Sequence, residues 1–342
     1  MRERLHDTRL SRRSVFTSLV HLPQALADRL DDQPPEQADA ALLERYQTVI
    51  TACWQWSKGP DLLPIEQALP FYLRGLEQIA HASSKHTQEA AHLLAQGYEL
   101  RGILAFHRND LPARADFCRL GVQWARQAAD PTLLVAAIAT YGATFRYTDQ
   151  PQQAFQSYQE ALARLDQASP LAQASLLIKL AEAYAQLGQK PEAERSLSRA
   201  YKVFPVHSWD DPAALFADCG EPSICLWDGL THLALSRTSS ADEPTARLHL
   251  RHTWDMLDLY GGTKPPFVVS ERNHVEILVH QAETAIALDD LDVFTAIFAD
   301  TVIAMKALGS ERRRQEAIAV YWQARQHWPY EVRVSDLAEL FL

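Results

Sequence analysis

A helix-pair motif that recurs along the chain constrains its fold more than any other feature. The clearest copy, residues 174–205, reads ASLLIKLAEAYAQLGQKPEAERSLSRAYKVFP. Ala181 and Ala193 are small, which lets two helices approach closely, while Tyr184 and Leu197 can fill the space between successive pairs. One such pair cannot bury its apolar face alone, so the motif predicts several stacked pairs.

The ends of the two helices are also marked in this copy. Gly188 stands where the first helix should end, because glycine adopts the left-handed conformation at low cost. Pro205 marks the end of the second helix, since proline cannot continue one. The sequence therefore predicts two helices separated by a tight turn.

Further copies extend the pattern in both directions. Residues 138–161 match it with Ile138, Tyr141, Gly142, Phe145, Ala154, Tyr158 and Ala161. Weaker copies are expected at 98–120 and 229–250, with additional pairs at 39–80 and 268–308, and further helices at 311–327 and 334–341. The helices are longer than those of the shortest repeats of this kind.

These motifs resemble tetratricopeptide repeats, and their spacing is similar to the sensor arrays of bacterial helix-turn-helix transcriptional regulators. The resemblance covers 97–205 best and reaches residue 309. It implies an all-α, right-handed superhelix of about six antiparallel helix pairs at 38–310, after an N-terminal arm and linker at 1–37 and before C-terminal capping helices at 311–342. Fewer than 40 residues precede the array, too few for a helix-turn-helix domain of about three helices. If the chain belongs with those regulators, we expect it to be a fragment of one or a member without its own DNA-binding domain.

Composition agrees with an all-α chain and excludes several classes of partner. Glycine is 12 and proline 18 of 342 residues, and runs of alternating β-branched residues are nearly absent. The formal net charge of −10 gives no general attraction for phosphate backbones, so we expect no direct nucleic-acid binding. No apolar run approaches the ~20 residues of a membrane-spanning helix. Four cysteines form no disulfide framework, which suits a reducing, cytoplasmic compartment.

The N-terminus allows a second interpretation. Ser11-Arg12-Arg13 resembles a twin-arginine export signal. The following stretch contains His21 and Pro23, where a signal needs a clean apolar segment. Apolar residues recur there at helical spacing, which favours an amphipathic arm over export.

No motif in the sequence predicts catalysis, a cofactor or a metal. The spacing of Cys219 and Cys225 fits no common zinc motif. Glu276 and His280 share a helix face, but the His-Glu-x-x-His pattern of zinc proteases is absent. There is no phosphate-binding glycine loop and no nucleophile elbow. We therefore predict a protein that is not an enzyme.

The repeat resemblance implies where a ligand would bind, since the first helix of each pair lines the concave side. The candidate groove residues are Arg146, Tyr147, Glu182, Gln186, Trp227, Asp228, His232, Arg272, Glu276 and His280. This mixed polar and aromatic surface suits a peptide or protein partner and a regulatory output. The alternatives are a small-ligand sensor, with a pocket near 207–223 and 259–266, and an exported binding protein. The sequence does not indicate an oligomeric state.

The tryptophans fall into two groups. Trp54, Trp124, Trp254 and Trp322 stand among apolar neighbours and are predicted to be core or inter-repeat filler. Trp209, beside Asp210-Asp211, and Trp227 are better candidates to face a ligand.

Overall fold

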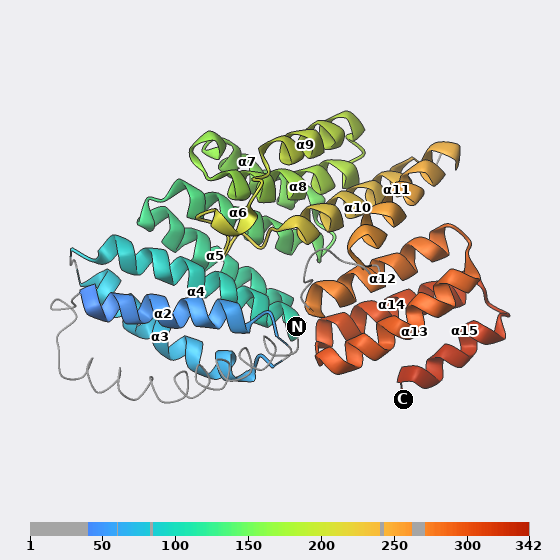
Figure 1. The fold of residues 1–342 in the computed structure, drawn as a ribbon, viewed down its shortest axis with the longest axis horizontal. Helices are drawn as coiled ribbons and strands as arrows, with labels where there is room; N and C mark the ends of the chain where they lie inside the picture. Colours follow the sequence, from blue (N-terminus) through green and yellow to red (C-terminus); the bar gives the residue numbers. More distant parts are fainter. Residues whose placement is uncertain (1–39, 60, 83–84, 240–242, 262–270, 342) are drawn as a thin grey trace.

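The computed structural model describes residues 40–59, 61–82, 85–239, 243–261 and 271–341, and every regular element in these residues is helical (Figure 1). The predicted N-terminal arm, and part of the predicted 259–266 loop, lie outside the described residues. The α-helices are α2 (Ala40–Trp56), α3 (Leu63–His81), α4 (Thr87–His107), α5 (Leu111–Ala128), α6 (Pro131–Arg146), α7 (Pro151–Leu162), α8 (Pro170–Gln186), α9 (Lys190–Val203), α10 (Glu221–Thr238), α11 (Glu243–Gly261), α12 (Glu271–Ala287), α13 (Leu291–Leu308), α14 (Glu311–His327) and α15 (Val332–Asp336). Short 3-10 turns occupy Leu165–Gln167, Ser208–Asp210 and Leu337–Phe341.

Consecutive helices form stacked pairs, from α2 with α3 to α12 with α13, and the first helices of successive pairs pack side by side. Figure 1 shows these pairs following one another in an arc, with α14 and α15 after the last pair. The predicted fold class, an all-α superhelix of helix pairs with capping helices, is confirmed for the described residues.

Side chains at the helix starts explain why the chain turns where it does. Asp110, Asp130, Ser169, Asp290 and Ser310 each accept a backbone N–H bond from the first turn of the following helix. Such caps satisfy donors that have no partner within the helix and contribute about 1 kcal/mol each. The helix boundaries are therefore encoded locally, turn by turn.

The small residues of the repeat have the predicted role. Ala181 and Ala193 are fully buried. A Cβ at Gly142 would collide with the ring of Tyr158 on the partner helix, so α6 and α7 need glycine there. Gly188 has φ +73°, the left-handed conformation expected after α8.

The apolar core has two main parts and a small third cluster of Ala185, Ala193, Ala234 and Leu235. One extends through the helices from α2 to α11 and includes Ile277, and the other joins α12, α13, α14 and the C-terminal turns from Val275 to Leu337. Helix α12 thus contributes to both. The boundaries of the predicted segments 1–37, 38–310 and 311–342 stay predictions.

The two ends of the array meet. Arg272 at the start of α12 donates to the carbonyl oxygens of Ser57 (3.0 Å) and Gly59 (2.6 Å), just after α2. His107 at the end of α4 lies 3.1 Å from the Ser310 hydroxyl, which caps α14. Carbonyls at a helix C-terminus lack intrahelical partners, so a guanidinium is a favourable neighbour for them. The C-terminal helices therefore close against α2 and α4 across the inner face.

Candidate functional site

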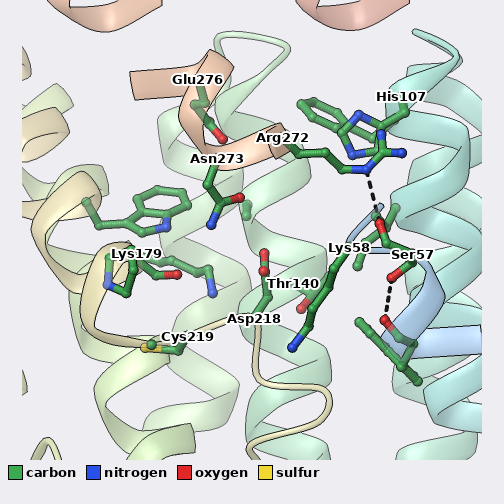
Figure 2. Close-up of a pocket in the computed structure, with 18 of the residues that line it drawn as sticks. Ser57, Lys58, His107, Thr140, Lys179, Asp218, Cys219, Arg272, Asn273 and Glu276 are labelled. Atoms are coloured by element: carbon green, nitrogen blue, oxygen red, sulfur yellow. Dashed lines mark hydrogen bonds between the residues drawn. The ribbon is translucent and has the colours of Figure 1, made fainter. Parts of the chain in front are cut away.

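A cavity of about 250 Å³ lies on the inner face where the ends of the array meet. Residues of α2, α4, α5, α6, α8, α10, α12 and α14 line it, together with part of the 207–223 segment. Figure 2 shows side chains from these helices pointing into a shared space. Ligand pockets commonly measure about 300–1,000 Å³, so this cavity suits a compact group.

The irregular segment 211–220, between the 3-10 turn at Ser208–Asp210 and α10, contributes to the lining of this cavity. Ala214, Leu215, Asp218 and Cys219 from this segment all contact it. Asp218 has φ +44°, and its carboxylate lies in the middle of the cavity in Figure 2. Burial raises the pKa of the Cys219 thiol to about 12, so this cysteine is an unreactive thiol at neutral pH.

The repeat wall, which we define as Arg114, Thr140 and Lys179, carries buried polar groups with few partners. Arg114 lies over the rings of Phe106 and Tyr147 and donates to Thr144, and it is 6% exposed. Lys179 is 2% exposed and donates to the Ser175 hydroxyl at 2.7 Å. Neither cation forms an ion pair with a described carboxylate.

Two further features show that the polar groups of this wall are poorly solvated. The Thr140 hydroxyl is buried and has no hydrogen-bond partner among the described residues. Burial lowers the pKa of Lys179, which reflects the cost of a charge removed from water. Buried charges are normally paired, and unpaired ones are destabilising, so a negative group near Lys179 is favourable, and the charge of Asp218 raises the pKa of Lys179 accordingly.

The C-terminal wall, which we define as Glu276 and Arg313, is neutralised internally, and Glu316 is a further partner of Arg313. Arg313 forms ion pairs with Glu276 and, at 2.6 Å, with Glu316. Burial alone would raise the pKa of Glu316, but Arg313 and Arg312 lower it to about 2. Its carboxylate is therefore ionised and held by its partners.

Burial shifts the pKa of a histidine and of a glutamate near the cavity toward the neutral form. Burial, together with Arg272, Arg313 and Arg114, lowers the pKa of His107 well below its usual range. Burial raises the pKa of Glu99 well above its usual range, and neither carboxyl oxygen has a hydrogen-bond partner among the described residues. His107 adds no negative charge to the cavity, and burial disfavours the ionised form of Glu99.

The structure brings four of the ten predicted groove residues to this cavity, namely Tyr147, Trp227, Arg272 and Glu276. Arg146 and Glu182 form a largely buried ion pair at 3.1 Å beside it, with Arg146 over the Trp227 ring and Gln186 donating to Glu182. His280 instead pairs with Glu283 at 3.1 Å.

Asp228 and His232 lie elsewhere and do not line the cavity. Both contact His252 on α11, and Asp228 also accepts a hydrogen bond from Tyr201 on α9. Burial, followed by His252, lowers the pKa of His232 to about 4, so its imidazole is neutral. These two residues form a separate cluster between α9, α10 and α11.

Sequence reasoning missed the residues that carry most of the charge here. Arg114 and Lys179 lie in helices where their spacing places them on a buried face, and a charge at a buried position is the signal that was available. Arg313, from a helix predicted as a cap, could not be placed, because that requires knowing that the array closes. Trp322, predicted as filler, is 59% exposed, which corrects that expectation.

No protein-family model matches this chain, and no curated protein is similar enough to match. Among solved structures, the chain is similar to one in the crystal structure of the APC/C hetero-tetramer Cut9–Hcn1, with 15% identity and a TM-score of 0.35. The match covers 93% of this chain and 58% of that chain, so this protein spans less than two thirds of it. A likeness of this size assigns no family or function. None of the described helices has the length and apolarity needed to cross a membrane.

Proposed function

We propose that this protein is a non-catalytic binding module that recognises the anionic end of a peptide or protein partner in its central cavity. One observation carries the proposal: Arg114 and Lys179 are buried cations that face a cavity without an ion pair to a described carboxylate. Proteins retain such unfavourable charges where a ligand supplies the counter-charge.

The aromatic groups around the cavity support this reading. Trp227 lies 5.7 Å from the Lys179 ammonium and also contacts the Arg146 guanidinium, while Trp54 adds a second indole to the lining. A flat apolar surface beside a cation suits the terminal residue of a chain, which combines a carboxylate with a side chain. The volume of about 250 Å³ has room for such a residue.

The position of the cavity allows ligand binding to have a regulatory effect. Its walls belong both to the N-terminal pairs and to α12 and α14, so a bound group contacts both ends of the array. A ligand that binds the closed arrangement more tightly than an open one shifts the population toward closure. A second protein that binds only the closed form would then bind only when the cavity holds its ligand.

Asp218 is the internal competitor in this scheme. Its carboxylate occupies the space where an external anion would bind, and it belongs to a segment without regular secondary structure. Replacement by asparagine removes a like charge from the site. We expect Asp218→Asn to tighten binding of anionic ligands.

A free small acid carries the same chemistry as a chain terminus, and this alternative is favoured by the limited cavity volume. The two sources separate in one experiment: the protein is isolated from its native cell, and its bound molecules and partner proteins are identified by mass spectrometry. We expect the wild type and the exposed-surface control Lys202→Met to retain the same bound species, and Lys179→Met to lose it.

A chain ending in an acidic residue, or a small acid, would identify the source. Synthetic peptides with a free or amidated C-terminus then test the first outcome, and only the free acid should bind. Equal retention of every bound species by Lys179→Met and by the wild type would contradict the proposal.

A further inference from the structure

Three side chains that can ligate one metal ion converge between α10 and α11, apart from the cavity. Asp228 and His232 lie one turn apart on α10, and His252 comes from α11. One possible ligand atom of each lies within 4.8 Å of the other two. The helix register of α10 therefore presents a carboxylate and an imidazole on one face, opposite a second imidazole.

The distances are close to those of a tetrahedral site. Asp228 Oδ1 lies 3.0 Å from His252 Nε2 and 3.6 Å from His232 Nε2. Metal–ligand bonds of about 2.0–2.1 Å put neighbouring ligand atoms of a zinc tetrahedron about 3.3 Å apart. Small side-chain adjustments would bring all three atoms to one ion.

The groups behind these ligands are those that orient metal ligands in proteins. The Tyr201 hydroxyl donates to Asp228 Oδ2 at 2.7 Å, the oxygen that does not face the histidines. His232 Nδ1 lies 2.8 Å from His249 Nδ1, which leaves its Nε2 directed at the cluster. Ligand histidines and carboxylates usually have such outer partners, which fix the tautomer and ring orientation.

The exposure of the three side chains would let a metal ion enter the site and be held there away from water. The Asp228 side chain is almost fully buried and His232 largely so, while the His252 side chain is 39% exposed. An ion could enter past His252 and lose most of its water at Asp228. Three protein ligands would leave one position for water or another donor.

We propose that Asp228, His232 and His252 bind a divalent transition-metal ion, with Zn²⁺ as the reference ion. Two imidazoles and one carboxylate form a donor set that suits Zn²⁺ and related ions rather than Ca²⁺ or Mg²⁺. The bound ion would join α10 to α11 and, through Tyr201, to α9. No motif predicted this site, because one ligand comes from a different helix.

The test is titration of the untagged, metal-free full chain with Co²⁺, followed by Zn²⁺ displacement, with visible absorption and calorimetry as readouts. We expect one ion per chain, the absorption of a four-coordinate cobalt site, and a higher Tm with Zn²⁺. His252→Ala should weaken Zn²⁺ binding by more than about 100-fold, and Tyr201→Phe by about 10–100-fold.

His327→Ala is the matched control. His327 also contacts a carboxylate, Asp289 at 2.9 Å, but among the residues that the structure describes no third ligand accompanies this exposed pair. This variant should bind Zn²⁺ as the wild type does. Absence of saturable binding by the wild type, or unchanged affinity in both His252→Ala and Tyr201→Phe, would overturn the proposal. Because Tyr201→Phe removes one oxygen, it keeps the test decisive if His252→Ala folds poorly.

Discussion

The two walls of the central cavity solve the problem of buried charge in opposite ways. On the C-terminal wall, Arg313 is held between Glu276 and Glu316, so each charge has a partner. On the repeat wall, Arg114 and Lys179 are equally buried, yet neither forms an ion pair with a described carboxylate. The first arrangement joins α14 to α12, whereas the second costs stability unless a negative group lies nearby.

Among the substitutions considered, we expect the largest loss of folding stability from one in the C-terminal wall, where Arg313 is paired. Arg313→Met leaves the buried Glu276 without its cation, while Glu316 keeps Arg312 at 2.7 Å, and loss of one partner of a buried pair typically costs about 3–5 kcal/mol. Urea denaturation should show a loss of this size. A loss below about 1 kcal/mol would mean that the C-terminal wall is open to water.

We expect the second-largest loss of stability when the contact between Arg272 and the segment after α2 is removed. Arg272→Met removes the guanidinium bonds to the carbonyls of Ser57 and Gly59, and bonds to charged groups contribute about 1.5–3 kcal/mol each. We expect a lower Tm and a larger radius of gyration by small-angle X-ray scattering. An unchanged radius would show that other contacts alone hold the ends together.

A substitution in the repeat wall should instead raise the stability of the folded protein. Lys179→Met replaces an unpaired buried ammonium by an apolar chain of similar length, so we expect a gain of about 1 kcal/mol in the free energy of unfolding. The same variant should lose ligand binding. Destabilisation by more than about 1 kcal/mol would show that Lys179 has a structural role.

The smallest effect is expected for Glu99→Gln, because burial favours the protonated carboxyl of Glu99, which an amide resembles. Its folded pKa is raised by burial above the ordinary value of 4.5, so the folded state holds this proton more tightly than the unfolded state. Stability from this group is therefore lost as the pH rises from 4.5 through the folded pKa. As the pH rises above 4.5, the Tm of the wild type should fall relative to that of Glu99→Gln, and parallel curves would contradict this assignment.

Much of the fold could be predicted because its signals are local. The spacing of Ala181, Tyr184 and Ala193, the turn at Gly188, and the capping residues all act within one helix pair. Packing between neighbouring pairs repeats the same contacts, so one clear copy indicates the others. The helices at Leu291–Leu308 and Glu311–His327 have the expected bounds.

The site was less predictable because it depends on contacts between distant segments. Arg272 meets Ser57 only when the array has curled far enough, and no local pattern encodes that curvature. Small rotations at each pair add up along a solenoid, so the place where its ends meet is a global property. The groove residues were therefore assigned to the inner face without knowledge of the C-terminal helices that cover it.

The most direct test of an anion site on the repeat wall compares the Tm of the wild type and Lys179→Met as succinate or phosphate is added at constant ionic strength. A ligand that binds the folded state raises Tm with its concentration. We predict that the variant is the more stable protein without anion, and that the wild type overtakes it as anion is added. Two curves that stay parallel over the whole titration would contradict the account.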